Sequence, residues 1–210
     1  MSAMAELSMR RVDACRTVAP LIAPDDLVVV SIGMVKDDWW NHRQADNAFY
    51  SSVLGTVSTI ALGLATALPH RRVVAIDSDG GILLNLGVLC TLGAVRPANL
   101  TVVVMDNGRY DSTGGHPTHT ARNTDLARMA EGAGCLDCAT ATDTATLARE
   151  FQRMLKDDGF GFLVAKLAAG RHPWTPEQQK PTDGVEDKYL FLRYVEKLER
   201  KVIYSGIGRH

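Results

Sequence analysis

The chain has 210 residues, of which 46% are hydrophobic and 22% charged, and its formal net charge at pH 7 is −1. This length supports one sizeable core and is short for two full domains, so we expect a single domain spanning residues 1–210. A nearly neutral chain offers no basic footprint for nucleic acid or an anionic membrane, and no apolar run approaches the ~20 residues that span a bilayer.

The amino-terminal segment MSAMAELSMRRVDACR lacks the apolar core of a secretory signal. Four cysteines in so apolar a chain do not predict a disulfide framework, which favours a reduced, cytoplasmic protein. Cys135 and Cys138 form a CxxC motif, which is typical of a redox pair or of half a cluster site. Because Cys15 and Cys90 lie in apolar, helix-like contexts, we expect buried free thiols instead of a cluster.

Hydrophobic periodicity predicts alternating helices and strands along the chain. Helices are expected at residues 5–21, 55–67, 82–95, 124–133, 142–156 and 185–201. Strands are expected at residues 26–31, 72–76, 100–105, 138–140 and 160–167. Asn123 or Thr124 is expected to cap the helix after the long polar loop 106–123. Nearly all-apolar strands between helices predict an α/β fold with a single doubly wound parallel sheet and helices on both faces.

Two polar clusters come directly after neighbouring strands of this predicted sheet. Asp77-Ser78-Asp79-Gly80-Gly81 follows the strand at 72–76, and Asp106-Asn107-Gly108 follows the strand at 100–105. Parallel strands would deliver both clusters to one carboxyl edge, where ligands of open α/β folds bind. A carboxylate, an amide oxygen and a loop carbonyl suit Mg²⁺, and glycines at a helix start let backbone N–H groups approach a phosphate. Each residue also has a simpler interpretation when it is taken alone: Asp79 could be a helix cap and Asn107 a turn residue.

At these residues the chain resembles the thiamine-diphosphate enzymes, whose signature is a GDG triplet followed at a set spacing by NN. The metal-binding Asp and Asn of that signature match Asp79 and Asn107, which are 28 residues apart. In the family a backbone carbonyl two residues after the Asn, here that of Arg109, completes the protein ligands. Ser78 and Asp106 depart from the pattern, since they replace the first Gly and the first Asn. The resemblance implies the diphosphate-binding type of domain, with thiamine diphosphate and Mg²⁺ as cofactors.

Within the family the chain resembles the β subunit of sulfopyruvate decarboxylase and phosphonopyruvate decarboxylase. The similarity runs from about residue 47 to residue 120 and includes the loop YDSTGGHPT at 110–118, which resembles the family's YGSTGGQPT. It implies a lyase that decarboxylates a small 2-oxoacid. The residues that it implies for cofactor binding are Ser52, Leu54, Ser78, Asp79, Gly80, Gly81, Asn107, Arg109, Tyr110, Asp111, Ser112 and Thr113.

Two residues are candidates for catalysis. Leu54 matches the apolar residue that, in the family, wedges the cofactor into a bent shape, although it could equally be a core leucine. His116 replaces the Gln of the resembling loop, and an imidazole there could protonate the carbanion left when CO2 departs. His119 reads more simply as a solvated loop histidine. The stretch from Lys36 to Trp40 departs from the relatives, and its two tryptophans suit an interface anchor.

The pyrimidine-activating Glu of the family has no counterpart in this chain. In the family it belongs to a separate pyrimidine-binding domain across a subunit interface. The resemblance therefore implies a partner α subunit that supplies this Glu, in an assembly of two α and two β subunits or more. Alternatives are a carboligase subunit, the β subunit of a 2-oxoacid:ferredoxin oxidoreductase, which needs a cysteine-bound cluster, and a non-catalytic cofactor-binding partner.

Overall fold

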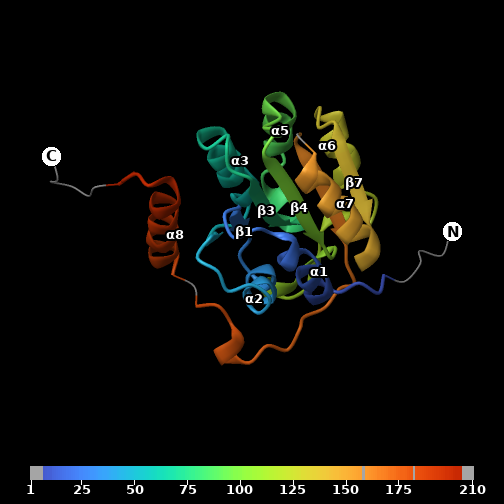
Figure 1. The fold of residues 1–210 in the computed structure, drawn as a ribbon. Helices are drawn as coiled ribbons and strands as arrows, with labels where there is room; N and C mark the ends of the chain where they lie inside the picture. Colours follow the sequence, from blue (N-terminus) through green and yellow to red (C-terminus); the bar gives the residue numbers. More distant parts are fainter. Residues whose placement is uncertain (1–6, 158, 182, 205–210) are drawn as a thin grey trace.

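Six parallel strands form the central sheet of the computed structural model, which describes residues 7–157, 159–181 and 183–204 (Figure 1). The strands, in their order across the sheet, are β2 (Ala48–Tyr50), β1 (Leu27–Val30), β3 (Val73–Ser78), β4 (Leu100–Asp106), β8 (Gly161–Lys166) and β7 (Asp137–Ala141). The four inner strands are buried almost throughout, as the apolar runs of the sequence require. The predicted parallel sheet is confirmed.

Helices cover both faces of the sheet (Figure 1). The sheet therefore divides the hydrophobic core into two clusters, one on each face. One face packs against α1 (Arg11–Val18), α2 (Met34–Trp40) and α7 (Thr144–Lys156). The other packs against α3 (Val57–Ala67), α4 (Asp79–Leu84), α5 (Val88–Val95), α6 (Leu126–Gly132) and α8 (Gly184–Glu199). Successive residues of β1 alternate between the two clusters, since side chains of a strand point to opposite faces. The fold is therefore doubly wound, as predicted.

Several predicted boundaries were wrong. The helix expected at 82–95 is two helices, α4 and α5, because the backbone of Asn85 is not helical, with φ −125° and ψ 56°; its side chain donates to the Gly55 carbonyl at 3.0 Å. The opening helix begins only at Arg11 in the described residues, and residues 5 and 6 lie outside them. The helix after the polar loop is capped by Asp125, whose carboxylate accepts from the Arg128 N–H, and not by Asn123 or Thr124.

The elements that periodicity missed are short or polar. Helix α2 contains Lys36, Asp37 and Asp38, which are buried, so its apolar pattern is hidden. Trp39 of the same helix is fully buried in the core, which is not the interface position that was suggested for it. Strand β2 has three residues, and a small hairpin in the polar loop pairs β5 (Arg109–Tyr110) with β6 (His116–Pro117).

The cysteines are free thiols, as expected, but they are not uniformly buried. Cys15 and Cys135 are buried, Cys138 in edge strand β7 is half-buried, and Cys90 is exposed. Burial raises the pKa of the Cys15 thiol, which keeps it protonated. Across the described residues no helix has both the length and the hydropathy that a membrane crossing requires.

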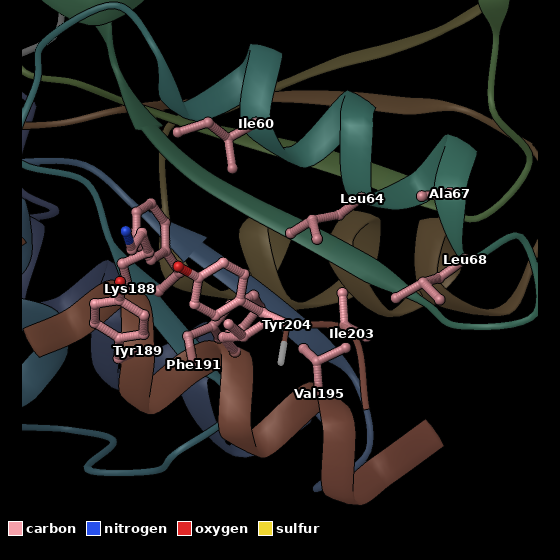
Figure 2. A pocket seen from close by; sticks show the side chains of 12 residues that line it. Ile60, Leu64, Ala67, Leu68, Lys188, Tyr189, Phe191, Val195, Ile203 and Tyr204 are labelled. Carbon is pink, nitrogen blue, oxygen red and sulfur yellow. The ribbon is translucent and has the colours of Figure 1, made fainter. Parts of the chain in front are cut away.

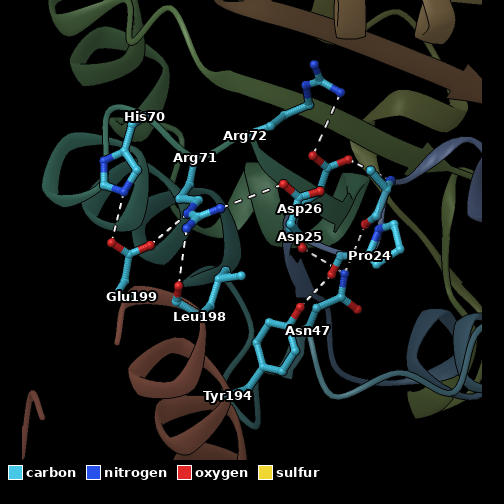
Figure 3. Close-up of polar contacts among 11 residues, drawn as sticks. Pro24, Asp25, Asp26, Asn47, His70, Arg71, Arg72, Tyr194, Leu198 and Glu199 are labelled. Carbon is cyan, nitrogen blue, oxygen red and sulfur yellow. Dashed lines mark hydrogen bonds and ion pairs between the residues drawn. The ribbon is translucent and has the colours of Figure 1, made fainter. Parts of the chain in front are cut away.

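Helix α8 is held at the β2 edge by polar contacts to loops that precede the strands (Figure 3). Glu199 accepts from Arg71 at 2.7 Å and contacts His70 at 2.9 Å. The Tyr194 hydroxyl donates to the Pro24 carbonyl at 2.5 Å. On its apolar side Phe191 packs on Phe49, with ring centroids 5.8 Å apart. These contacts fix α8 to the sheet at both its polar and its apolar face.

The close contact between α5 and α6 gives a prediction for Gly93. A Cβ at this buried glycine would lie 2.0 Å from the Ala133 carbonyl oxygen, which is a backbone atom. We therefore expect Gly93→Ala to lower the free energy of unfolding by roughly 1–3 kcal/mol or more, as overpacking does. Gly63→Ala is the control, since a Cβ there meets nothing within 4 Å, and it should stabilise α3 by about 0.5–1 kcal/mol. Urea denaturation of both variants measures this, and equal stabilities would contradict the packing described.

Candidate functional site

A cavity of about 280 Å³ lies at the carboxyl edge of the sheet, where β1, β3 and β4 end. Parallel pairing of β3 with β4 brings the two polar clusters of the sequence to this edge. Of the residues predicted to contact a cofactor, all except Ser52 and Gly81 line the cavity. The cavity also takes its walls from the end of β1 and the start of α2, at Ile32–Val35, and from Arg11 of α1.

Asp79 is the first residue of α4 and only 1% exposed. Its Oδ2 accepts from Thr118 Oγ1 at 2.6 Å and from Thr120 Oγ1 at 3.2 Å. The capping role suggested for Asp79 belongs instead to Ser78, whose hydroxyl accepts from the Gly81 N–H at 3.1 Å. Burial raises the pKa of the Asp79 carboxyl to about 6. The fold thus holds a poorly solvated carboxylate at the wall of the cavity.

Asp106, at the end of β4, is held by its own set of donors. Its Oδ2 accepts from Lys166 Nζ at 2.6 Å, and its Oδ1 accepts from Thr120 Oγ1 at 2.6 Å and from the Gly108 N–H at 3.2 Å. Thr120 therefore touches both Asp79 and Asp106. Asp106 does not line the cavity with Asp79, and its role in the structure is to pair with Lys166 and shape the turn.

Asn107 and Asp111 are joined by a hydrogen bond inside the loop that follows β4. Asn107 Nδ2 donates to Asp111 Oδ2 at 2.7 Å, and Asn107 Oδ1 accepts from the Arg109 N–H at 3.2 Å. Asp111 also pairs with Arg11, whose Nη1 lies 3.4 Å from Asp111 Oδ2. All four residues line the cavity, so the amide of Asn107 is oriented at its wall.

Two glycines let the loop 109–113 lie close to the strand ends. A Cβ on Gly80 would lie 2.4 Å from the Tyr110 ring, so Tyr110 packs directly over the start of α4. Gly33 has φ +83°, and a Cβ there would lie 2.6 Å from Ser112 Oγ. The absence of side chains at both positions leaves backbone N–H groups and loop hydroxyls facing the same cavity.

The donor set suits a hard divalent cation that also has ligands from outside the chain. Within the described residues no group of three or more His, Cys, Asp or Glu side chains is placed to hold a metal by itself. Asp79, Asn107 and Arg109 line one cavity, and their carboxylate, amide and backbone carbonyl oxygens are of the type that could hold Mg²⁺ completed by phosphate oxygens.

Several predicted residues lie apart from the cavity. Ser52 is exposed, and the Ser51 hydroxyl is engaged by Thr56 Oγ1 at 2.8 Å in the turn before α3. His116 and His119 are both exposed and do not line the cavity, although His116 pairs across the hairpin with Tyr110, which does. Leu54 is half-buried and lines it. Cys135 and Cys138 contact each other, but within the described residues no group of three or more His, Cys, Asp or Glu side chains includes them.

Sequence reasoning missed Arg11, Thr118 and Thr120. Arg11 lies in an amphipathic helix, where a charged residue ordinarily faces solvent, and only the fold buries it. No sequence pattern marks the two threonines, because they reach Asp79 only after the loop folds back over the strand ends. The end of β1 at Ile32–Gly33 could have been found, since it is a third strand end at the same edge.

A larger groove of about 690 Å³ lies between α3 and α8 (Figure 2). Aliphatic and aromatic side chains such as Leu64, Phe191 and Val195 form its walls, with Lys188 beside them. It offers apolar surface without converging polar groups. The smaller cavity at the strand ends is therefore the candidate site.

Comparison with known proteins places the chain among cofactor enzymes. Residues 32–165 match the family described as "Thiamine pyrophosphate enzyme, C-terminal TPP binding domain". The sulfopyruvate decarboxylase subunit beta of Methanocaldococcus jannaschii is 34% identical over 90% of this chain and 98% of its own length. The same subunit of Methanothermobacter thermautotrophicus is 36% identical over 78% of this chain and 85% of its own length. The phosphonopyruvate decarboxylase of Streptomyces viridochromogenes is 33% identical over 71% of this chain and 37% of its own.

Solved structures share the fold at low identity. A putative thiamin diphosphate-dependent enzyme from Mycobacterium smegmatis superposes with a TM-score of 0.66 at 22% identity, over 77% of this chain and 32% of its own. The thiamine diphosphate-dependent 4-hydroxybenzoylformate decarboxylase of Rhodococcus jostii RHA1 superposes with a TM-score of 0.68 at 18% identity, over 82% of this chain and 35% of its own. The chain thus spans about a third of these solved chains and corresponds to one of their domains in fold.

Because burial raises the pKa of Asp79, its charge should destabilise the metal-free protein. The folded pKa of about 6 exceeds the usual 3.8, so this penalty is absent below pH 3.8, accumulates between pH 3.8 and pH 6, and is complete above pH 6. We expect Asp79→Asn to raise the free energy of unfolding in EDTA at pH 8 by up to about 3 kcal/mol, and by about a third of that at pH 4.5. Denaturant titrations at both pH values measure this. A variant equally or less stable at pH 8 would contradict it.

Proposed function

The chain belongs to the thiamine pyrophosphate enzymes, and we propose that it is the diphosphate-binding β subunit of a Mg²⁺-dependent 2-oxoacid decarboxylase. The observation that carries this proposal is the meeting of Asp79 and Asn107 on one cavity at the ends of β3 and β4. The relatives named as sulfopyruvate decarboxylase subunit beta support it, since they match nearly the whole chain.

In this proposal Asp79, Asn107 and the Arg109 carbonyl hold Mg²⁺, and the cation anchors the cofactor diphosphate. Gly80, Ser112 and Thr113 line the same cavity, and their polar groups can contact phosphate oxygens. Thiamine diphosphate supplies the electron sink that decarboxylation of a 2-oxoacid needs. Leu54 provides apolar support beside it. This chain's own task is to bind and orient the cofactor and to limit water at the strand ends.

A partner subunit completes the proposed enzyme. By resemblance it is a pyrimidine-binding α chain that contributes the catalytic Glu, in an assembly of two α and two β subunits or more. Val53, beside Leu54, is 57% exposed, and Leu84, which packs by Gly55, is 64% exposed. Apolar side chains exposed around the cavity are typical of a surface that a second chain covers.

For the substrate we propose a small 2-oxoacid with a second anionic group. Relatives are named for sulfopyruvate and for phosphonopyruvate, which share this chemistry. The stretch Lys36–Trp40, where the chain departs from those relatives, is engaged within the protein: Lys36 and Asp37 contact Lys180, and Asp38 contacts Arg11.

The function is tested with the chain purified together with its partner. We expect calorimetry to detect thiamine diphosphate uptake in the presence of Mg²⁺, and CO2 release from sulfopyruvate or phosphonopyruvate to exceed release from pyruvate. Asp79→Ala should weaken cofactor uptake by at least roughly 100-fold, because it removes a metal ligand. Asp125→Ala, which removes the remote cap of α6, is the control and should bind normally. Unchanged uptake by Asp79→Ala would refute the proposal.

His116 is proposed as a proton donor at the mouth of the cavity. Its hairpin partner Tyr110 lines the cavity, and an imidazole exchanges protons near neutral pH. We expect His116→Gln to leave thiamine diphosphate binding intact and to lower kcat by about 100-fold or more. His119→Gln is the matched control, since this histidine lies in the same loop and should not affect kcat. Equal turnover in the two variants would remove His116 from the mechanism.

A further inference from the structure

The segment that connects β8 to α8 runs along helix α2 (Figure 1). We call its described part, residues 168–181, the connecting arm. The Lys180 N–H donates to Asp37 Oδ1 at 3.0 Å, Lys36 Nζ donates to the Lys180 carbonyl at 2.6 Å, and Asn41 Nδ2 donates to the Gln178 carbonyl at 2.7 Å. Buried charged residues of α2 thus bind the arm. The arm contains one short 3-10 helix, Pro176–Gln178, and is otherwise irregular.

One contact of the arm reaches deeper than the others. Trp174 Nε1 donates to Asp38 Oδ1 at 2.6 Å. The other oxygen of Asp38 accepts from Arg11 Nε at 2.5 Å. The side chains of Asp38 and Arg11 are only 2% and 6% exposed, so these two donors replace water around the carboxylate.

Arg11 continues this line of contacts to the cavity. Its Nη1 lies 3.4 Å from Asp111 Oδ2, and the same oxygen accepts from Asn107 Nδ2 at 2.7 Å. One guanidinium is therefore shared by two buried carboxylates, Asp38 and Asp111. The line of contacts joins the arm, α2, α1 and the loop after β4, and it ends on a residue proposed to bind the metal.

We propose that the connecting arm positions the metal-binding amide of Asn107 through Trp174, Asp38, Arg11 and Asp111. This inference rests on the proposed function, because it assumes a cation at Asp79 and Asn107. An amide can present either its oxygen or its nitrogen, and a carboxylate accepts only from the nitrogen. Asp111 therefore directs the Asn107 oxygen away from itself; that oxygen accepts from the Arg109 N–H at 3.2 Å, and its second lone pair is left for the cation.

The role of Trp174 follows from how the guanidinium is shared. While the indole N–H satisfies one oxygen of Asp38, Arg11 can also support Asp111. Without that donor Asp38 depends more fully on Arg11, whose 3.4 Å contact to Asp111 is the longest and weakest of the line. Asp111 would then be less well neutralised and would hold Asn107 less firmly. Trp174 and the residues between it and Asn107 are positioning residues, and their loss should appear as weaker metal binding.

The experiment measures Mn²⁺ affinity by electron paramagnetic resonance, on the full-length chain in complex with its partner and saturated with thiamine diphosphate. Asp111→Asn should weaken binding by roughly 10- to 100-fold, as the loss of a group that orients a metal ligand does. Trp174→Phe keeps the ring and removes one N–H, and it should weaken binding by roughly 2- to 30-fold. Combined with Asp111→Asn, Trp174→Phe should add no further loss, because the connection is already broken.

Tyr194→Phe is the control, since it deletes one side-chain hydrogen bond of similar length, to the Pro24 carbonyl, from the helix that follows the arm. It should leave Mn²⁺ affinity unchanged even if thermal stability falls. Wild-type affinity in Trp174→Phe, or additive losses in the double variant, would overturn the inference while leaving the proposed function intact. Failure of the wild-type complex to bind Mn²⁺ and thiamine diphosphate would overturn both.

Discussion

Burial of carboxylates at the ends of β3 and β4 is the constraint on which this molecule depends. A charged group in a poorly solvated site is costly unless donors or cations surround it. Asp79 has two threonine hydroxyls, Asp106 has Lys166, and Asp111 has Arg11 and Asn107. These partners come from segments far apart in the chain, so the loop after β4 must fold back over the strand ends to supply them. The need to neutralise the acids thus shapes the cavity.

The parallel sheet places these buried acids close together at one edge. Parallel pairing of apolar strands is stable only when both faces are covered, and it brings every strand end to the same edge. Not every acid at that edge enters the cavity. Asp77 turns toward α3, where it accepts from the Ser58 hydroxyl at 2.6 Å and from its backbone N–H at 3.2 Å, and burial raises its pKa. Asp77 therefore connects α3 to the sheet, and Asp79, two residues later, lines the cavity.

The carboxyl-terminal part of the chain is fastened to this core in two ways. Helix α8 packs Phe191 on Phe49. Its Glu199 also accepts from Arg71 (Figure 3). The stretch before it uses polar contacts to α2, one of which leads through Arg11 to the cavity. Charged residues buried in a short helix are costly in isolation, and here they are matched by backbone and side-chain partners of the arm. The last third of the chain therefore takes part in building the site.

From the sequence alone, the parallel sheet, its two covered faces and the placement of Asp79 and Asn107 at one edge of the sheet could be predicted. Strand identity follows from apolar runs, and the placement of both clusters follows from strand direction, so local patterns suffice. The sequence did not decide that Asn85 would break a helix, that Ser78 would cap α4, or that Thr118, Thr120 and Arg11 would reach the acids. Those outcomes depend on which side chains meet after the loop and α1 have packed, and contacts between residues up to 100 positions apart leave no periodic trace in the chain.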